Sequence, residues 1–113
     1  MDLASFQCVA CRPDSPQVPA DDEAGLLAGI PDWKLVEVNG VKRLKRVFRV
    51  SGWRPAVDLA NKVADLADEQ DHHPSIRIEW GRVTVEWWTH AIKGLHRNDF
   101  IMAAKTDELL PDR

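Results

Sequence analysis

The sequence lacks the features that would direct a protein into or across a membrane. No run of about eighteen apolar residues occurs, so we expect no membrane-spanning helix. Residues 1–10 lack the basic start and the apolar stretch of a secretory signal. We therefore expect a cytoplasmic protein, either an enzyme or a binding domain.

Cysteine is scarce, and its two copies, Cys8 and Cys11, form a single C-x-x-C motif. A zinc site needs about four ligands, so this pair would require a second half from elsewhere in the chain. A thioredoxin-like motif would follow a strand in a βαβ unit, and no such pattern surrounds these residues. We expect reduced thiols in a mobile N-terminal arm, because a structural disulfide does not suit a reducing cytoplasm.

Excess positive charge is also absent, since the chain has a formal net charge of −3. This acidic balance argues against a nucleic-acid partner. One basic run, residues 42–46 continued by Arg49, departs from the balance. We interpret the run as a strand whose charged residues face water, and a nuclear-import or nucleic-acid patch is the alternative.

The length and composition predict one compact domain. The chain has 113 residues, of which 44% are hydrophobic and 29% charged, enough for one core but not for two. Residues 1–20, with Pro13, Pro16 and Pro19, predict an irregular N-terminal arm. Residues 21–113 then form the single folded domain.

A short helix and a hairpin are predicted at the start of this domain. Acidic residues 21–23 suit the positive end of a helix dipole. Asn39-Gly40 predicts a two-residue hairpin turn because both residues tolerate positive φ. The flanking strands should cover residues 33–38 and 41–50. Arg46 falls on the apolar face of the second strand and breaks its pattern.

The most strongly patterned element is a helix after Ser51, which we expect to be its N-cap. Pro55 suits the first turn, where backbone N–H groups have no helical partner. Asp68 lies at the border of the apolar stripe. The stripe itself follows helical spacing: Ala56, Leu59, Ala60, Val63, Leu66 and Ala67.

A second hairpin and a last helix complete the predicted fold. Pro74 ends the helical region, and residues 75–80 and 82–89 alternate as two strands around Gly81. A helix is predicted over about residues 98–110. The order helix, strand, strand, helix, strand, strand, helix predicts an α+β fold, with three helices packed on one face of a four-stranded antiparallel sheet.

Three histidines around the second hairpin form the candidate site. Pairing its strands about the turn places His90 opposite His72 or His73, where Cβ atoms lie about 5 Å apart. Asp68 precedes His72 by one helical turn, so its carboxylate could point to the same place, and Asp71 is adjacent. Imidazoles beside carboxylates suit acid/base chemistry near neutral pH.

Two other interpretations apply to these histidines. Three imidazoles and a carboxylate could bind zinc, although adjacent histidines in an extended chain point in opposite directions. His96 lies three residues before Asp99 and is interpreted as an imperfect helix cap.

The site residues resemble those of the pterin-4a-carbinolamine dehydratase family. Its signature is an acidic residue, three positions, His-His-Pro, an aromatic residue, a Thr-His pair and an aspartate early in the last helix. The matching residues are Asp68, His72, His73, Pro74, Trp80, Thr89, His90 and Asp99.

The resemblance covers about residues 26–110 and also includes Trp33, which matches a tryptophan of the first strand. Residues 87–100 and the C-x-x-C motif are similar to the bacterial branch. Two positions depart from the pattern. Asp68 stands where many members have the longer glutamate, and His96 replaces the usual serine or threonine cap.

The resemblance implies a homodimeric or homotetrameric enzyme that needs no metal or other cofactor. Its pterin substrate would be the 4a-hydroxytetrahydropterin left by aromatic amino acid hydroxylases, which is dehydrated to quinonoid dihydropterin. By motif position, His72 and His90 are the acid/base candidates, His73 holds the substrate, and Asp68 orients an imidazole. The implied substrate-binding set is His72, His73, Pro74, Thr89, His90, Asp71 and Asp99.

Two other functions stay open at this point. Animal members of the family also bind a transcription factor, so the fold can serve as a protein-binding module. An enzyme on the same scaffold could instead act on a related pterin, for example in molybdopterin metabolism.

Overall fold

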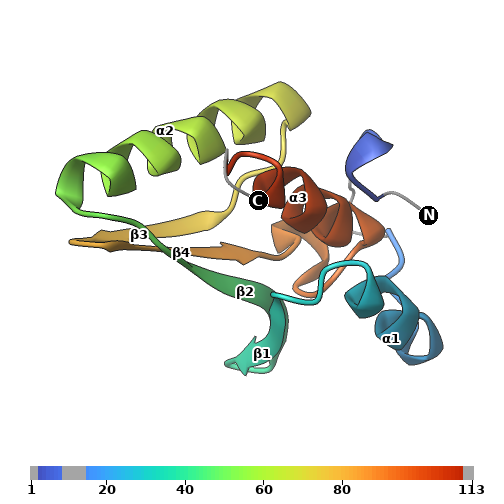
Figure 1. Cartoon of the computed structure of the whole chain (residues 1–113). Helices are drawn as coiled ribbons and strands as arrows, with labels where there is room; N and C mark the ends of the chain where they lie inside the picture. Colours follow the sequence, from blue (N-terminus) through green and yellow to red (C-terminus); the bar gives the residue numbers. More distant parts are fainter. Residues whose placement is uncertain (1–2, 9–14, 111–113) are drawn as a thin grey trace.

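The computed structural model describes residues 3–8 and 15–110, which form a sheet with helices over one face (Figure 1). The predicted α+β fold and its element order are confirmed, and a short 3-10 turn is added at each of two places. The elements in chain order are η1 Leu3–Ser5, α1 Ala20–Ala28, β1 Lys34–Val38, β2 Val41–Arg49, α2 Trp53–Gln70, β3 Ser75–Glu79, β4 Arg82–Trp87, η2 His90–Ile92 and α3 Arg97–Asp107.

The four strands form one antiparallel sheet in the order β1-β2-β4-β3. The first hairpin turns at Asn39 and Gly40, which have φ values of 53° and 79°. Val38 lies opposite Val41, so these two residues form the whole loop, as predicted from their tolerance of positive φ.

The second hairpin turns one residue earlier than expected. Glu79 lies opposite Arg82, so Trp80 and Gly81 form the turn, with Gly81 at φ 78°. The predicted pairing of His90 with His72 or His73 is therefore wrong. The ladder ends where Ser75 meets Glu86, and its continuation would set His72 level with Thr89.

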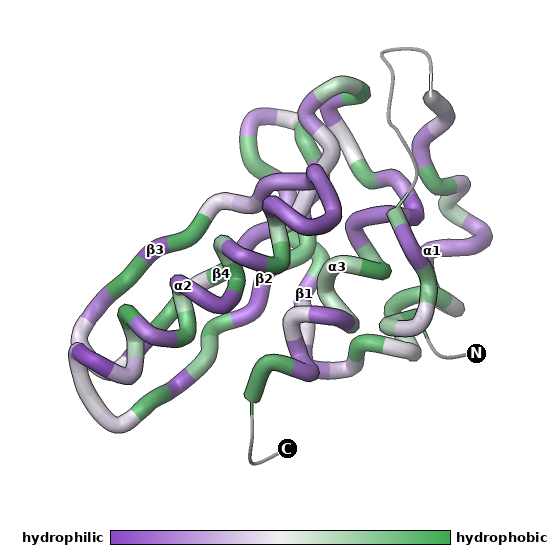
Figure 2. The backbone as a smooth tube through the Cα atoms, turned by 90° about the horizontal axis from the view of Figure 1, so that it is seen from above, coloured by the Kyte–Doolittle hydropathy of each residue, from purple (hydrophilic) through white to green (hydrophobic). Residues whose placement is uncertain are grey.

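Helix α2 lies along the sheet and buries its apolar stripe against it. In Figure 2 the helix alternates between hydrophilic and hydrophobic residues along its length. The predicted N-cap at Ser51 is wrong, because Gly52 occupies that position and makes no side-chain cap. The buried Gly52 accepts the N–H of Gly81 at 3.3 Å, so docking on the second hairpin decides where the helix begins.

Helix α1 lies beside the two layers and has no buried residue (Figure 1). An ion pair between Glu23 and Lys42 joins it to β2 at 3.0 Å. Within the predicted N-terminal arm, η1 packs against α3 and buries Leu3 and Ala4. Lys105 donates to the carbonyl of Ala4 at 2.8 Å, which ties this turn to the last helix.

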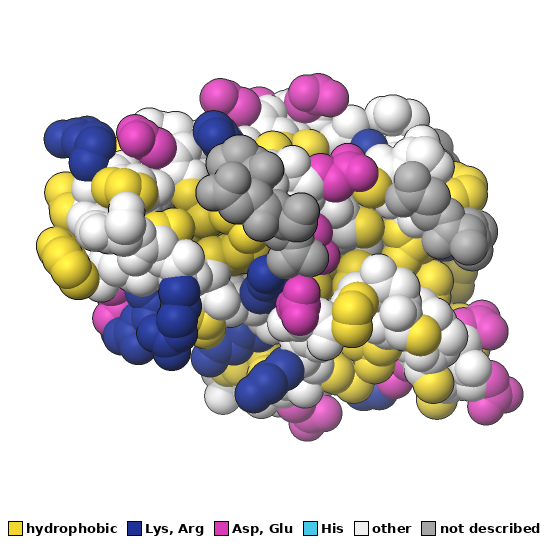
Figure 3. All heavy atoms as spheres, in the orientation of Figure 1, with side chains coloured by type: hydrophobic (Ala, Val, Ile, Leu, Met, Phe, Trp, Pro, Cys, Tyr) yellow, Lys and Arg dark blue, Asp and Glu magenta, His cyan; other side chains and the backbone are white. Residues whose placement is uncertain are grey.

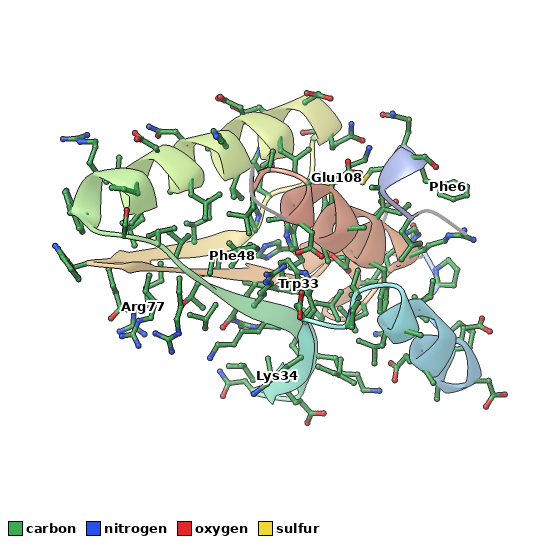
Figure 4. The ribbon with its side chains drawn as sticks, viewed as in Figure 1. Phe6, Trp33, Lys34, Phe48, Arg77 and Glu108 are labelled. Carbon is green, nitrogen blue, oxygen red and sulfur yellow. The ribbon has the colours of Figure 1, made fainter. Side chains whose placement is uncertain are left out.

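Arg46, which broke the apolar pattern of β2, lies on the helix-covered face of the sheet. Its guanidinium lies over the ring of Phe48 and pairs with the carboxylate of Asp107 on α3. The indole of Trp33 donates to the same carboxylate at 2.8 Å. Figure 4 shows Trp33 and Phe48 between the sheet and α3. The arginine is thus tolerated in the core because it is both stacked and paired.

The other face of the sheet carries much of the basic run. Arg77 projects from this face in Figure 4, and Lys and Arg side chains gather below the strands in Figure 3. Arg43, Lys45 and Arg49 alternate with the buried Leu44 and Phe48 along β2. No helix among the described residues is long and apolar enough to cross a membrane.

Candidate active site

The centre of the candidate site is Asp99, in the first turn of α3. Its side chain is fully buried, so each carboxylate oxygen needs partners inside the protein. Oδ2 accepts from the Thr89 hydroxyl at 2.8 Å and from the His96 backbone N–H at 2.9 Å. Oδ1 lies 2.7 Å from Nε2 of His72. One carboxylate therefore joins residues from the end of α2, the end of β4 and the start of α3.

His72 reaches Asp99 because α2 ends in a left-handed residue. Asp71 has φ 51° and ψ 45°, and the next N–H, that of His72, bonds back to the carbonyl of Ala67 at 3.1 Å. This turn points the imidazole inward, where it stacks on Trp87 at 5.7 Å and 9°. Only 10% of the His72 side chain is exposed. Its ring is held by a hydrogen bond at one edge and by an aromatic ring on one face.

The bond to Asp99 indicates which nitrogen of His72 is available for chemistry. An ionised carboxylate only accepts hydrogen bonds, so Nε2 of His72 carries the proton in this pair. Nδ1 is then the nitrogen that can accept or return a proton. Within residues 3–8 and 15–110, Nδ1 of His72 makes no hydrogen bond.

His73 lies next in the chain but has a different environment. Its Nε2 is 3.2 Å from Oδ1 of Asp68, and the two side chains are 57% and 79% exposed. The contact expected between Asp68 and His72 is thus made with His73 instead. The left-handed turn at Asp71 explains the change, since it directs His72 inward and leaves His73 outside.

Thr89 and His90 begin a short loop that leads from β4 to α3. Thr89 exchanges two backbone hydrogen bonds with Gly94, at 2.9 and 3.4 Å, which closes the loop around η2. Gln17 donates to the carbonyl of Ile92, and Val18 donates to that of Leu95. The predicted arm therefore helps to hold the loop, a role that its proline-rich sequence does not indicate.

His90 is the first residue of η2, and its exposed ring packs on Trp88. The two ring centroids are 4.5 Å apart, and the ring planes are tilted by 47°. Trp87 is buried under the helices, where its indole donates to Thr106 of α3. Trp88 lies on the opposite face, under the guanidinium of Arg43. Two consecutive tryptophans thus each support one of the candidate histidines, on either side of the end of β4.

His96 caps α3 as expected, but the cap is complete rather than imperfect. Its Nδ1 accepts the backbone N–H of Asn98 at 3.0 Å, while its own N–H donates to Asp99, which forms a capping box. Burial lowers the pKa of His96 below 6.5, the nearby Asp99 carboxylate opposes this shift, and His72 adds to it. A neutral imidazole is what the cap requires, since Nδ1 must accept.

The remaining predicted residues lie around this centre. Asp71 is exposed and Pro74 is half-buried, and neither side chain hydrogen-bonds to Asp99. Cys8 lies near the site, with its Sγ 3.9 Å from the carbonyl of Asn98, and Cys11 lies outside the described residues. No three His, Cys, Asp or Glu residues in the described ranges are grouped to hold a metal ion.

A hollow of about 610 Å³ lies beside the site rather than over it. His96 and Arg97 of the α3 start form one wall, and residues 16–19 with the first turns of α1 form the other. His72, His73 and His90 are not among its lining residues.

Comparisons with known proteins identify the family of the chain. The family model "Pterin 4 alpha carbinolamine dehydratase" matches residues 16–109. A protein of Nitrosococcus oceani that carries the name of this dehydratase is 53% identical over 109 residues, which are 96% of this chain and 96% of that protein.

The transcriptional coactivator/pterin dehydratase from Brucella melitensis has a similar fold, with a TM-score of 0.74 and 24% identity. The match covers 83% of this chain and 98% of that one. At this identity, the likeness concerns the fold alone. From the family match and the Nitrosococcus relative, the chain belongs to the pterin-4-alpha-carbinolamine dehydratase family of lyases.

Proposed function

We propose that this protein removes water from a 4a-hydroxytetrahydropterin to give quinonoid dihydropterin, with His72 and His90 as acid and base. The observation that carries the proposal is the buried Asp99, which binds His72 directly and holds Thr89, the residue before His90. The buried carboxylate thus orients His72 directly and fixes the residue that precedes His90 in the chain, which supports a joint role for the two histidines.

The reaction needs two proton transfers, one for each imidazole. Hydroxide is a poor leaving group, so an imidazolium protonates the 4a oxygen while the lone pair of the adjacent ring nitrogen expels water. The C–O bond breaks, and a neutral imidazole accepts the proton of a ring N–H. Each transfer contributes roughly 10²–10⁴-fold to the rate. No electrons are gained or lost overall, so no redox cofactor takes part.

The environments of the residues support different roles. Asp99 positions His72 and leaves its Nδ1 for the substrate, while Thr89 helps to hold Asp99 in place. His73 is exposed and is proposed to contact the bound pterin, with Asp68 orienting its ring. Pro74 and Asp71 flank this position in the chain and complete the proposed substrate-binding set.

The proposed context is the recycling of a tetrahydropterin used by an aromatic amino acid hydroxylase, in the cytoplasm. We also propose that the protein is a homodimer or homotetramer. Light scattering of the purified protein measures the oligomer. Parallel assays with biopterin-type and other 4a-carbinolamines would test the choice of substrate.

The decisive test is the rate of 4a-carbinolamine dehydration in three purified variants. His72→Ala and His90→Ala should each lose about 10²–10⁴-fold in kcat. Trp53→Ala, at an exposed position far from the site, should keep the wild-type rate. Wild-type rates in both histidine variants contradict the acid/base assignment. Activity abolished by a chelator would favour zinc chemistry instead.

A further inference from the structure

The position of His90 is determined by packing rather than by hydrogen bonds. Its imidazole is exposed, and in the described part of the chain it makes no side-chain hydrogen bond. Among the residues that the structure describes, its one ring contact is with Trp88. His72, by contrast, is fixed by both Asp99 and Trp87. An acid or base needs a defined orientation, so His90 depends on the aromatic ring beneath it.

Trp88 is itself held by two residues of the open sheet face. The guanidinium carbon of Arg43 lies 3.8 Å from the ring centroid, within the range of a cation–π contact. Nη1 of Arg43 pairs with Glu86 at 2.8 Å, and both side chains are about one-fifth exposed. Leu44 and Trp87 are directly opposed in the sheet, and continuing this register sets their neighbours Arg43 and Trp88 opposite each other on the other face.

Arg43 has a feature that packing alone does not explain. Its Nε is buried and has no hydrogen-bond partner within the described residues. The contacts that hold this guanidinium are therefore its ion pair with Glu86 and its stacking on Trp88.

We propose that Trp88 is the positioning residue of His90, with Arg43 and Glu86 holding the indole in place. The proposal rests on the proposed acid/base role of His90. Trp88 restricts the imidazole to one region at the end of β4, and Arg43 prevents the indole from turning away. A displaced imidazole would still be present but would no longer meet the proton that it transfers.

Steady-state kinetics of 4a-carbinolamine dehydration test the proposal. Trp88→Ala should lower kcat by about 10–100-fold with a smaller change in KM, because the imidazole is misplaced rather than removed. Trp88→Phe keeps a flat ring and should recover most of this loss. Arg43→Met should cost about 2–5-fold. Arg49→Met removes a cation from the same strand and face without a ring contact, and it should have no effect.

Measuring the effect of Trp88→Ala again in a His90→Ala background separates positioning of the imidazole from general structural damage. With the imidazole gone, adding Trp88→Ala should cost nothing further. An undiminished loss in that background overturns the proposal, as does a wild-type kcat in Trp88→Ala.

Proton NMR of the imidazole C–H groups gives a readout that does not depend on turnover. The ring current of Trp88 should shift the His90 resonances, and Trp88→Ala should return them toward free imidazole. Unmoved resonances overturn the positioning role. A fully active His90→Ala contradicts the proposed function instead, and the resonances then still decide whether Trp88 places the ring.

Discussion

Two adjacent histidines, each beside an aspartate, have opposite environments in this protein. His72 lies 2.7 Å from Asp99, with 10% and 0% of the two side chains exposed. His73 lies 3.2 Å from Asp68, with 57% and 79% exposed. The residue types and the contact are the same, but only the first pair is enclosed by Trp87, Thr89 and the start of α3.

The difference lies in what surrounds each pair. An exposed pair is screened by water and must give up side-chain freedom to form, so it contributes little. A buried carboxylate must instead accept hydrogen bonds from donor groups of the protein. These hydrogen bonds also fix the orientation of the donor groups. The comparison shows that a site histidine becomes rigid through the burial of its partner, not through the presence of a carboxylate as such.

The largest expected effect follows from removing the buried carboxylate. Asp99→Ala leaves His72, Thr89 and the His96 N–H without their acceptor. We expect the free energy of unfolding to fall by about 3 kcal/mol, and dehydration to slow because His72 is no longer oriented. Urea denaturation followed by tryptophan fluorescence measures the first effect.

Asp99→Asn is the matched control for that substitution. It keeps the size of the side chain and one acceptor oxygen, so it should retain more stability than Asp99→Ala. If both variants unfold at the same urea concentration as the wild type, the buried pair contributes no more to stability than the exposed pair. That result would contradict the difference drawn between them.

A smaller effect is expected at His96, which shares Asp99 with His72. His96→Ala removes the acceptor for the Asn98 N–H and should cost about 1 kcal/mol of stability. His96→Ser restores a capping oxygen and should recover most of the loss. Urea denaturation of the two variants checks that His96→Ser is more stable than His96→Ala. Equal stability of the two variants would exclude a capping role for the side chain.

The same cap makes stability depend on pH. Burial lowers the pKa of His96 in the folded protein, so the unfolded chain binds this proton more readily. The contribution of His96 is therefore complete above about pH 6.5, the unfolded value, and is lost as the pH falls toward the folded pKa. Urea midpoints between about pH 5 and 7.5 should decline on the acid side in the wild type and less steeply in His96→Ser.

The smallest effect is expected at the exposed pair. Asp68→Asn should change the free energy of unfolding by less than about 0.5 kcal/mol, because the contact with His73 is solvated. Added salt should reduce even this difference. A loss comparable to that of Asp99→Ala would mean that exposure does not separate the two pairs. Dehydration rates of the variant report independently whether the carboxylate orients His73 for the substrate.

The elements with local signals were predicted well. Asn39-Gly40 specified its own turn, and the stripe from Ala56 to Ala67 specified α2. The second hairpin was predicted less accurately, because Gly81 alone does not determine which neighbouring residue forms the turn with it. A shift of one residue there removed the expected pairing of His90.

The candidate site shows the same division between local and long-range information. The motif contains His72, Thr89 and Asp99, which the structure joins, but it did not predict that Asp99 would bind His72 while Asp68 bound His73. Trp88 and Arg43 were not predicted at the site at all. Cross-strand neighbours depend on register, and no short sequence pattern encodes it here.

The sequence by itself determined the α+β order, the two hairpins, the amphipathic α2 and the set of histidines and aspartates near the end of β4. Tertiary structure alone decided which aspartate each histidine meets and which ring supports it. The physical reason is that helical and turn preferences act over a few residues. Burial of Asp99 instead requires α2, β4 and α3 to meet around it.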